Sequence, residues 1–219
     1  MTHRWLLLAC GMAVGSGSGS AQSESGEYWF EISASMGIDA FSAPSVTDYV
    51  NIIAQPADRI EEFSTAVEFA VTPEFRISKS WSAGLDYNYL IKSYSAAGVG
   101  GESMFTYGIH LPFLVVHYVI PWKGSRLKVG GGAGMAIASF EERLFGSSSV
   151  RNSRAQGGGL KLEAIGNSRF DDHFYGVLAV EMRWVIGEAF HQNLSGTRNI
   201  TPKLNYFSIG LKFGVEFVW

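Results

Sequence analysis

The last seventeen residues alternate between apolar and other side chains. From Lys203 the sequence reads KLNYFSIGLKFGVEFVW, and every second position from Phe207 to Trp219 is apolar. Because successive side chains of a β-strand point to opposite faces, this pattern predicts one strand with a continuous apolar face. Typical strands have about 5–6 residues, whereas a tilted strand that crosses a bilayer needs about 9–11. The segment therefore predicts a membrane-spanning strand whose apolar face meets lipid.

Seven earlier segments show the same alternation, which predicts eight strands in all. The others are expected at 27–39, 63–77, 81–94, 103–120, 126–140, 157–167 and 173–186. On the fourth, the residues expected to face lipid are Phe105, Tyr107, Ile109, Leu111, Phe113 and Val115. The last strand has to pair with the first as well as the seventh, because lipid does not tolerate an open edge. We therefore expect Trp219 to lie near Trp29.

The connections between these segments alternate in length. The short ones are 78–80, 121–125 and a turn at 171–172, and the long ones are 40–62, 141–156 and 187–202. The segment 95–102 is intermediate and rich in Gly and Ala. Short turns at one end and long loops at the other are typical of outer-membrane barrels.

The N-terminus has the layout of a secretory signal peptide. A basic start ending at Arg4 is followed by the short apolar run Trp5 to Val14 and by small residues up to Ala21. We expect a signal peptide at 1–21, a short segment at 22–26 and the barrel at 27–219. An alternative is a lipoprotein signal that uses Cys10, although the apolar run before it is very short. No other stretch approaches the ~18 continuous apolar residues of a membrane helix.

Charge and cysteine content narrow the function classes. Cys10 is the only cysteine, so removal of the signal leaves no disulfide. The formal charge of −3 becomes −4 without Arg4, with 16 basic against 20 acidic residues, which does not favour nucleic acid. No pair of histidines has metal-ligand spacing, and we expect no cofactor.

The chain resembles the small eight-stranded outer-membrane β-barrels of the OmpA and OmpX type. The most specific feature is the terminal strand that ends in Phe217-Val218-Trp219, although Phe is the commoner last residue in such proteins. The resemblance implies an all-β, antiparallel, up-and-down transmembrane barrel in the outer membrane of a Gram-negative-type bacterium. It also implies an insertion signal for the barrel-insertion machinery at Phe213, Val215, Phe217 and Trp219.

Charged residues alternate with the apolar face and are expected to point into the barrel. The predicted lumen residues are Glu31, Glu68, Glu74, Arg76, Asp86, Lys92, His110, Lys128, Lys161, Glu163, Glu181, Arg183, Lys212 and Glu216. Side chains just fill an eight-stranded barrel, and buried charges have to be paired. We therefore expect an ion-pair network that plugs the lumen, with at least one pair between the seventh and eighth strands. The alternative is a water or ion path. Gly130, Gly132 and Gly134 on the fifth strand are expected to leave room for these side chains.

Basic residues also occur in and near the long loops. They are Arg143, Arg151, Arg154, Arg198 and Lys203. Lipopolysaccharide presents phosphates at this level, and Arg binds phosphate in bidentate fashion. Contact with lipopolysaccharide is therefore one interpretation, and a solvated charged surface is the other.

An enzyme that modifies lipid A is a further alternative. Its candidate residues are His110, and His191 with Ser195. The stretch around His191 is weakly similar to the His-x-Ser-Asn stretch of lipid A deacylases, but Gln192 stands at the serine position. Without that nucleophile the similarity does not carry the activity.

The leading hypothesis is a non-enzymatic outer-membrane barrel with a structural role or an unknown surface partner bound by its loops. The alternative is a narrow porin or conduit for small solutes. A soluble ligand-binding barrel would need an apolar interior, whereas here the apolar face alternates with a charged one.

Overall fold

The alternating segments fold into eight long strands. The computed structural model describes residues 29–56, 59–61, 63–98, 101–146, 150–192 and 201–219. The long strands are β1 (Phe30–Ser42), β2 (Phe63–Ser78), β3 (Trp81–Gly98), β4 (Gly101–Trp122), β5 (Ser125–Arg143), β6 (Arg151–Arg169), β7 (Phe174–Ala189) and β9 (Lys203–Val218). A helix α1 (Pro44–Ala54) and a two-residue strand β8 (His191–Gln192) complete the described elements. The predicted signal peptide and the segment 22–26 lie outside the described residues.

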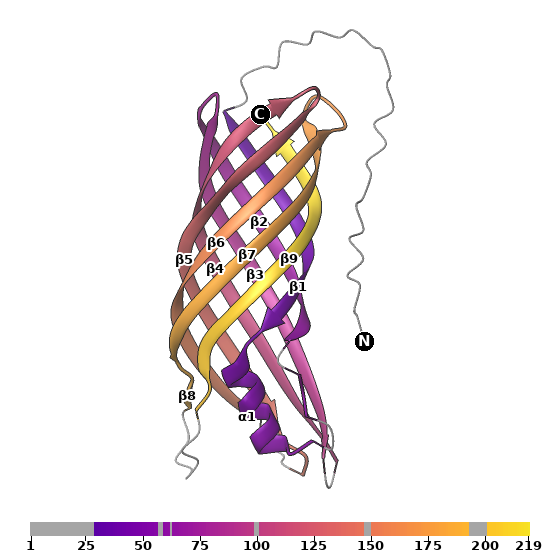
Figure 1. Cartoon of the computed structure of the whole chain (residues 1–219), viewed down its shortest axis with the longest axis vertical. Coiled ribbons are helices and arrows are strands. Elements are labelled where there is room, and N and C mark those ends of the chain that lie inside the picture. The colour runs from indigo at the N-terminus through magenta and orange to yellow at the C-terminus, as the bar shows by residue number, and fades with distance from the viewer. Residues whose placement is uncertain (1–28, 57–58, 62, 99–100, 147–149, 193–200) are drawn as a thin grey trace, which may run out of the picture.

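The eight long strands form a closed antiparallel ring (Figure 1). Each pairs with the next along the chain, and β9 pairs with both β7 and β1. The expected closure is confirmed: the Trp29 amide donates to the Trp219 carbonyl at 3.1 Å, and the Trp219 amide donates to the Phe30 carbonyl at 3.0 Å. None of the long strands keeps an open edge, as lipid requires.

The two ends of the barrel differ. At the end that holds Trp219, residues 79–80 and 123–124 make two-residue connections. At the opposite end, β3 and β4 continue to Gly98 and Gly101, so the predicted connection 95–102 is largely strand. Similarly, β5 and β6 take up most of the predicted loop 141–156. The backbone ladders continue where the apolar alternation stops, which is why the strands predicted from the sequence are too short at this end.

Apolar side chains cover the outside of the ring. Leu211 and Phe213 are 52% and 55% exposed, and Leu114 is 72% exposed. At the end with the short turns, the exposed tryptophans are Trp29, Trp81, Trp122 and Trp219. Aromatic rings at that level are expected at a membrane interface. Within the described residues, no helix is long and apolar enough to cross a membrane.

The predicted facing of the fourth strand is wrong. The six residues expected to meet lipid, from Phe105 to Val115, are at most 1% exposed and point into the barrel. Both faces of this segment carry large apolar side chains, so alternation alone did not choose between them. The register decides: His110 pairs with Tyr89, which lies on the outer face of β3. A shift of one residue would exchange the two faces of the strand.

The inward side chains of β4 build an aromatic layer at the end opposite the short turns. The Tyr107 ring lies 5.9 Å from that of Phe41, 5.7 Å from that of Phe190 and 6.4 Å from that of Phe140. These side chains are buried together in the main apolar cluster of the described residues. The interior of this half of the barrel is therefore mainly aromatic and aliphatic, which the sequence analysis did not predict.

Helix α1 covers the aromatic layer, within the segment expected to be a loop (Figure 1). Pro44 occupies its first turn, where a missing backbone N–H costs nothing, and the helix ends where Gln55 adopts a left-handed conformation with φ of 44°. Val46, Tyr49 and Val50 recur at helical spacing and are buried. The Tyr49 hydroxyl donates to Glu142 Oε2 at 2.9 Å, which ties the helix to β5.

Candidate functional site

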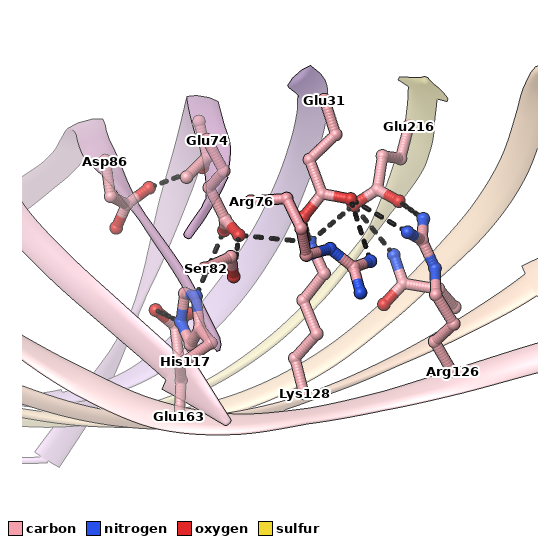
Figure 2. A network of polar contacts seen from close by, with 12 residues as sticks. Glu31, Glu74, Arg76, Ser82, Asp86, His117, Arg126, Lys128, Glu163 and Glu216 are labelled. Carbon is pink, nitrogen blue, oxygen red and sulfur yellow. Dashed lines mark hydrogen bonds and ion pairs between the residues drawn. The ribbon is translucent and has the colours of Figure 1, made fainter. Parts of the chain in front are cut away.

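A first group of charges fills the barrel beside the short turns. Arg126 on β5 donates to Glu31 at 2.9 Å and also contacts Glu216, so it bridges the first and last strands. The Lys128 ammonium contacts Glu31, and it lies 2.9 Å from Glu216 and 3.2 Å from Glu74 (Figure 2). These side chains are at most 9% exposed. Burial of so many charges is tolerable because each carboxylate faces a cation.

His117 links this group to the middle of the barrel. Its Nδ1 lies 3.1 Å from Glu74 Oε1, and its Nε2 lies 2.9 Å from Glu163 Oε1 (Figure 2). An imidazolium can donate from both ring nitrogens, which matches carboxylates on both sides. Ser82 donates a further hydrogen bond to Glu74 at 2.8 Å. The inverted facing of β4 hid this residue from the sequence analysis.

A second group of charges lies deeper, around Arg183 on β7. Arg183 contacts Glu181, donates to Glu68 at 2.9 Å and lies 3.8 Å from Asp39. The Lys212 ammonium on β9 lies 2.7 Å from Glu181 Oε2. The ion pair expected between the last two long strands is therefore present.

Lys161 on β6 connects the two groups. It contacts Asp86 and lies 3.0 Å from Glu163 and 3.4 Å from Glu181. Glu163 is also hydrogen-bonded to His117. Ion pairs and hydrogen bonds therefore run without a break from the short-turn end to the aromatic layer. The interior beside the short turns is therefore filled by a connected network of charged side chains.

Three of the inner carboxylates have a spacing that suits a cation. Oxygen atoms of Asp39, Glu68 and Glu181 all lie within 4.8 Å of one another. Oxygen ligands at such a spacing are typical of hard cations. Here, however, Arg183 and Lys212 already contact these carboxylates, so the chain supplies its own counter-charge.

Glycines on β5 also allow a neighbouring strand to approach closely. A Cβ on Gly130 would collide with the Val116 carbonyl and lie 2.7 Å from the His117 ring. A Cβ on Gly132 would lie 2.8 Å from the Val115 side chain. The glycines allow β4 and its inward side chains to approach β5 closely, and do not simply leave free room.

The structure places the predicted lumen residues as follows. Those buried inside the barrel are Glu31, Glu68, Glu74, Asp86, Lys128, Lys161, Glu163, Glu181, Arg183, Lys212 and Glu216. Arg76 is partly exposed at the short-turn end, 3.9 Å from Glu31, and Lys92 donates to the Thr65 carbonyl near the other end. The placement of His110 is wrong, because it lies on the outer face of β4.

Three acidic or basic interior residues were absent from the predicted set. His117, Arg126 and Glu142 are buried inside the barrel. Arg126 shares the alternation of Lys128, and that alternation could have identified it. Glu142 lies beyond the point where the expected strand ended. Asp39, expected on the inward face of the first strand, is buried there.

The other predicted sites lie on the outside or the rim. Phe213 and Val215 are exposed, and the Trp219 ring packs against Phe217 at 4.3 Å and Phe30 at 5.1 Å. Among the basic residues, Arg143, Arg154 and Lys203 are exposed and Arg151 is partly buried. Arg198 lies outside the described residues, as does Ser195, the proposed partner of His191.

Comparisons with solved structures match the fold. Neisserial surface protein A (NspA) aligns with a TM-score of 0.54 and 12% identity over 87% of this chain and 97% of its own. Ail, the attachment invasion locus protein of Yersinia pestis, aligns with a TM-score of 0.42 and 12% identity, over 86% and 98%. The outer membrane protease OmpT of Escherichia coli gives 0.48 and 6%, over 87% and 97%.

No protein-family model matches the chain, and no curated protein matches its sequence. The likeness to NspA, together with the closed ring of eight long strands, shows the fold of the small outer-membrane β-barrels. The expected fold is thereby confirmed. An identity of 12% does not carry an activity from one protein to another.

Proposed function

We propose that this protein is exported with a cleaved signal peptide and resides in the outer membrane as a closed, non-conducting barrel. The observation that carries the proposal is the double filling of its interior. A charged layer occupies the half beside the short turns, and an aromatic layer covered by α1 occupies the other half. A continuous water path would need an open polar route along the axis, whereas here the buried charges are paired and the second layer is mainly aromatic and aliphatic.

Conductance tests the closed lumen. The barrel, refolded in planar bilayers, is expected to give no steady ohmic current, and an open porin measured in the same bilayers is the positive control. Steady single-channel current would favour the alternative of a narrow conduit. Cell fractionation and N-terminal sequencing test export: the protein is expected in outer-membrane fractions and to begin at Gln22.

The proposed role is structural or one of surface interaction, not catalysis. The end opposite the short turns carries α1 and the long β3–β4 and β5–β6 hairpins (Figure 1). In the proposed outer-membrane location, this end would present a folded surface outside the membrane. His110, one enzyme candidate, contacts the side chains of Tyr87 and Tyr89 on the outer face. Lipid A masses from cells with and without the gene are expected to be identical, and a changed acyl or phosphate content would favour an enzyme.

A further inference from the structure

Polar side chains lie on the outer wall of the barrel on four neighbouring strands, β3 to β6. The Tyr87 hydroxyl lies 2.7 Å from His110 Nδ1, and the His110 ring stacks on Tyr89 at 4.6 Å. The two polar groups are each other's hydrogen-bond partner, which lowers the cost of placing them on an outward face.

The strip continues across β5 to β6. A Cβ on Gly108 would lie 3.2 Å from the Tyr89 hydroxyl and 3.3 Å from Ser139 Oγ, so both hydroxyls border the same glycine. Gly108 pairs with Ser139, and Ser139 pairs with Arg154. We call these residues the outer strip: Tyr87, Tyr89, His110, Ser139 and Arg154.

The outer surface becomes more polar near the strip. On its short-turn side, the outward residues of β4 include Leu114 and Val116, and those of β6 include Leu160 and Leu162, all exposed. On its other side, the outward residues of β5 include Glu141 and Arg143, which pair at 2.7 Å, although Met104 on β4 is also exposed there.

The height of His110 agrees with the edge of the outer leaflet. Along β4, residues 110 and 118 are eight positions apart, and Tyr118 packs on Trp81 in the aromatic ring at the short-turn end. With about 3.4 Å per residue and a tilt of 35–45°, His110 lies roughly 20 Å above that ring. The apolar band of such barrels is about 25 Å tall, so His110 lies near its far edge. Arg154 lies farther from the short-turn end, because it is ten positions beyond Ala164, which is in register with Tyr118 through Val129.

Arg154 supplies the charge that a ligand would meet. It is exposed, and among the described residues no carboxylate lies within ion-pair distance of it. Its neighbours Arg143 and His191 face Glu141 and Glu188 instead. A free guanidinium beside hydroxyls and flat rings suits a phosphate attached to a sugar, because Arg binds phosphate in bidentate fashion and hydroxyls bind sugar oxygens.

We propose that the outer strip binds the phosphorylated sugar headgroup of an outer-leaflet glycolipid, with Arg154 on the phosphate and His110 with its two tyrosines against the sugars. His110 on β4 and Arg154 on β6 are two strand spacings apart, or roughly 10 Å, which suits a headgroup of two sugars. The inference rests on the proposed outer-membrane location. It adds a site on the wall of the barrel, away from its loops.

Native mass spectrometry of the refolded full-length mature barrel tests the proposal. The probes are diphosphorylated lipid A, dephosphorylated lipid A and phosphatidylglycerol. We expect the first to bind tightest, and Arg154→Gln to weaken it about tenfold, the value of one lost charge-assisted contact. His110→Leu is expected to weaken the binding of both the diphosphorylated and the dephosphorylated lipid A. Arg59→Gln, an exposed arginine on the segment after α1, is the matched control and should bind as the wild type does.

Three outcomes would overturn the site: equal binding of phosphatidylglycerol and lipid A, unchanged binding by both strip variants, or the same loss in Arg59→Gln. A heat-dependent gel shift confirms that each variant is folded, and Tyr87→Phe replaces His110→Leu if the latter does not fold. A barrel that fractionates with the outer membrane but does not bind lipid A overturns this inference alone.

Discussion

At the scale of single residues, the two faces of each strand obey opposite rules. Outward positions tolerate apolar side chains and penalise charge, whereas inward positions beside the short turns require charge in pairs. Lys212 and Phe213 are neighbours in the chain, yet Lys212 is 4% exposed among carboxylates and Phe213 is 55% exposed on the wall. The energetic effect of a substitution therefore depends on whether the side chain points into the barrel or out of it.

Replacement of Phe213 by Arg should destabilise the barrel by about 2–4 kcal/mol, because it places a charge near the bilayer midplane. Urea unfolding in lipid vesicles measures the change, with Phe213→Leu as the control. If Phe213→Arg and Leu211→Arg both unfold at the wild-type urea concentration, the lipid-facing assignment of β9 is wrong.

Replacement of Lys212 by Met should cost about 3–5 kcal/mol, because it leaves Glu181 and Glu68 with one cation fewer in a buried site. The double variant with Glu181→Gln should recover part of this loss. The same unfolding assay measures both variants. Strictly additive losses would mean that water solvates the two side chains independently, as in an open pore.

At the scale of elements, β4 contributes inward side chains to both halves of the interior. Its inward residues include His117 in the charged half and Phe105 to Val115 in and next to the aromatic half, while Leu114 and Val116 face outward. Its facing is set by pairing with β3 and β5, since either face alone could meet lipid. This is also the element for which alternation led to the wrong assignment.

Cysteine labelling tests that facing directly. The predicted mature chain has no cysteine, so Leu114→Cys and Phe113→Cys each introduce a single reporter. A lipid-soluble maleimide should label Leu114→Cys in intact vesicles and leave Phe113→Cys unmodified until the barrel is unfolded. Preferential labelling of Phe113→Cys would instead support the facing predicted from the sequence, with Phe113 toward lipid.

At the scale of the whole molecule, closure of the ring depends on the last residues. Trp219 exchanges backbone hydrogen bonds with Trp29 and Phe30, and its ring packs on Phe30 and Phe217. Removal of these residues would expose backbone groups of β1 at the membrane interface, where lipid leaves them unsatisfied.

Deletion of Phe217–Trp219 should therefore leave the protein unassembled in the periplasm. Fractionation and the heat-dependent gel shift measure assembly, and Trp219→Phe, which keeps a terminal aromatic ring, should assemble normally. Wild-type amounts of inserted barrel after the deletion would contradict a membrane barrel closed by β9 and β1.

The sequence by itself determined the class of fold and much of the charged layer. The period of two in β9 identifies a strand and its lipid face without any neighbour. Glu181, Arg183 and Lys212 alternate with apolar residues that face lipid, so these charged side chains have to point into the barrel. Where the two faces differ strongly in polarity, burial alone orients the strand, and no tertiary information is needed.

Only the tertiary structure decided the facing of β4, the aromatic layer and the role of α1. In β4 both faces are apolar, so pairing with β3 had to choose between them. Val46, Tyr49 and Val50 form a helical stripe too short to stand out in a polar segment, and burial over the barrel mouth is what stabilises it. The partners of each charge also depended on closure, because Arg126 and Glu31 meet across the ring, 95 residues apart in the chain.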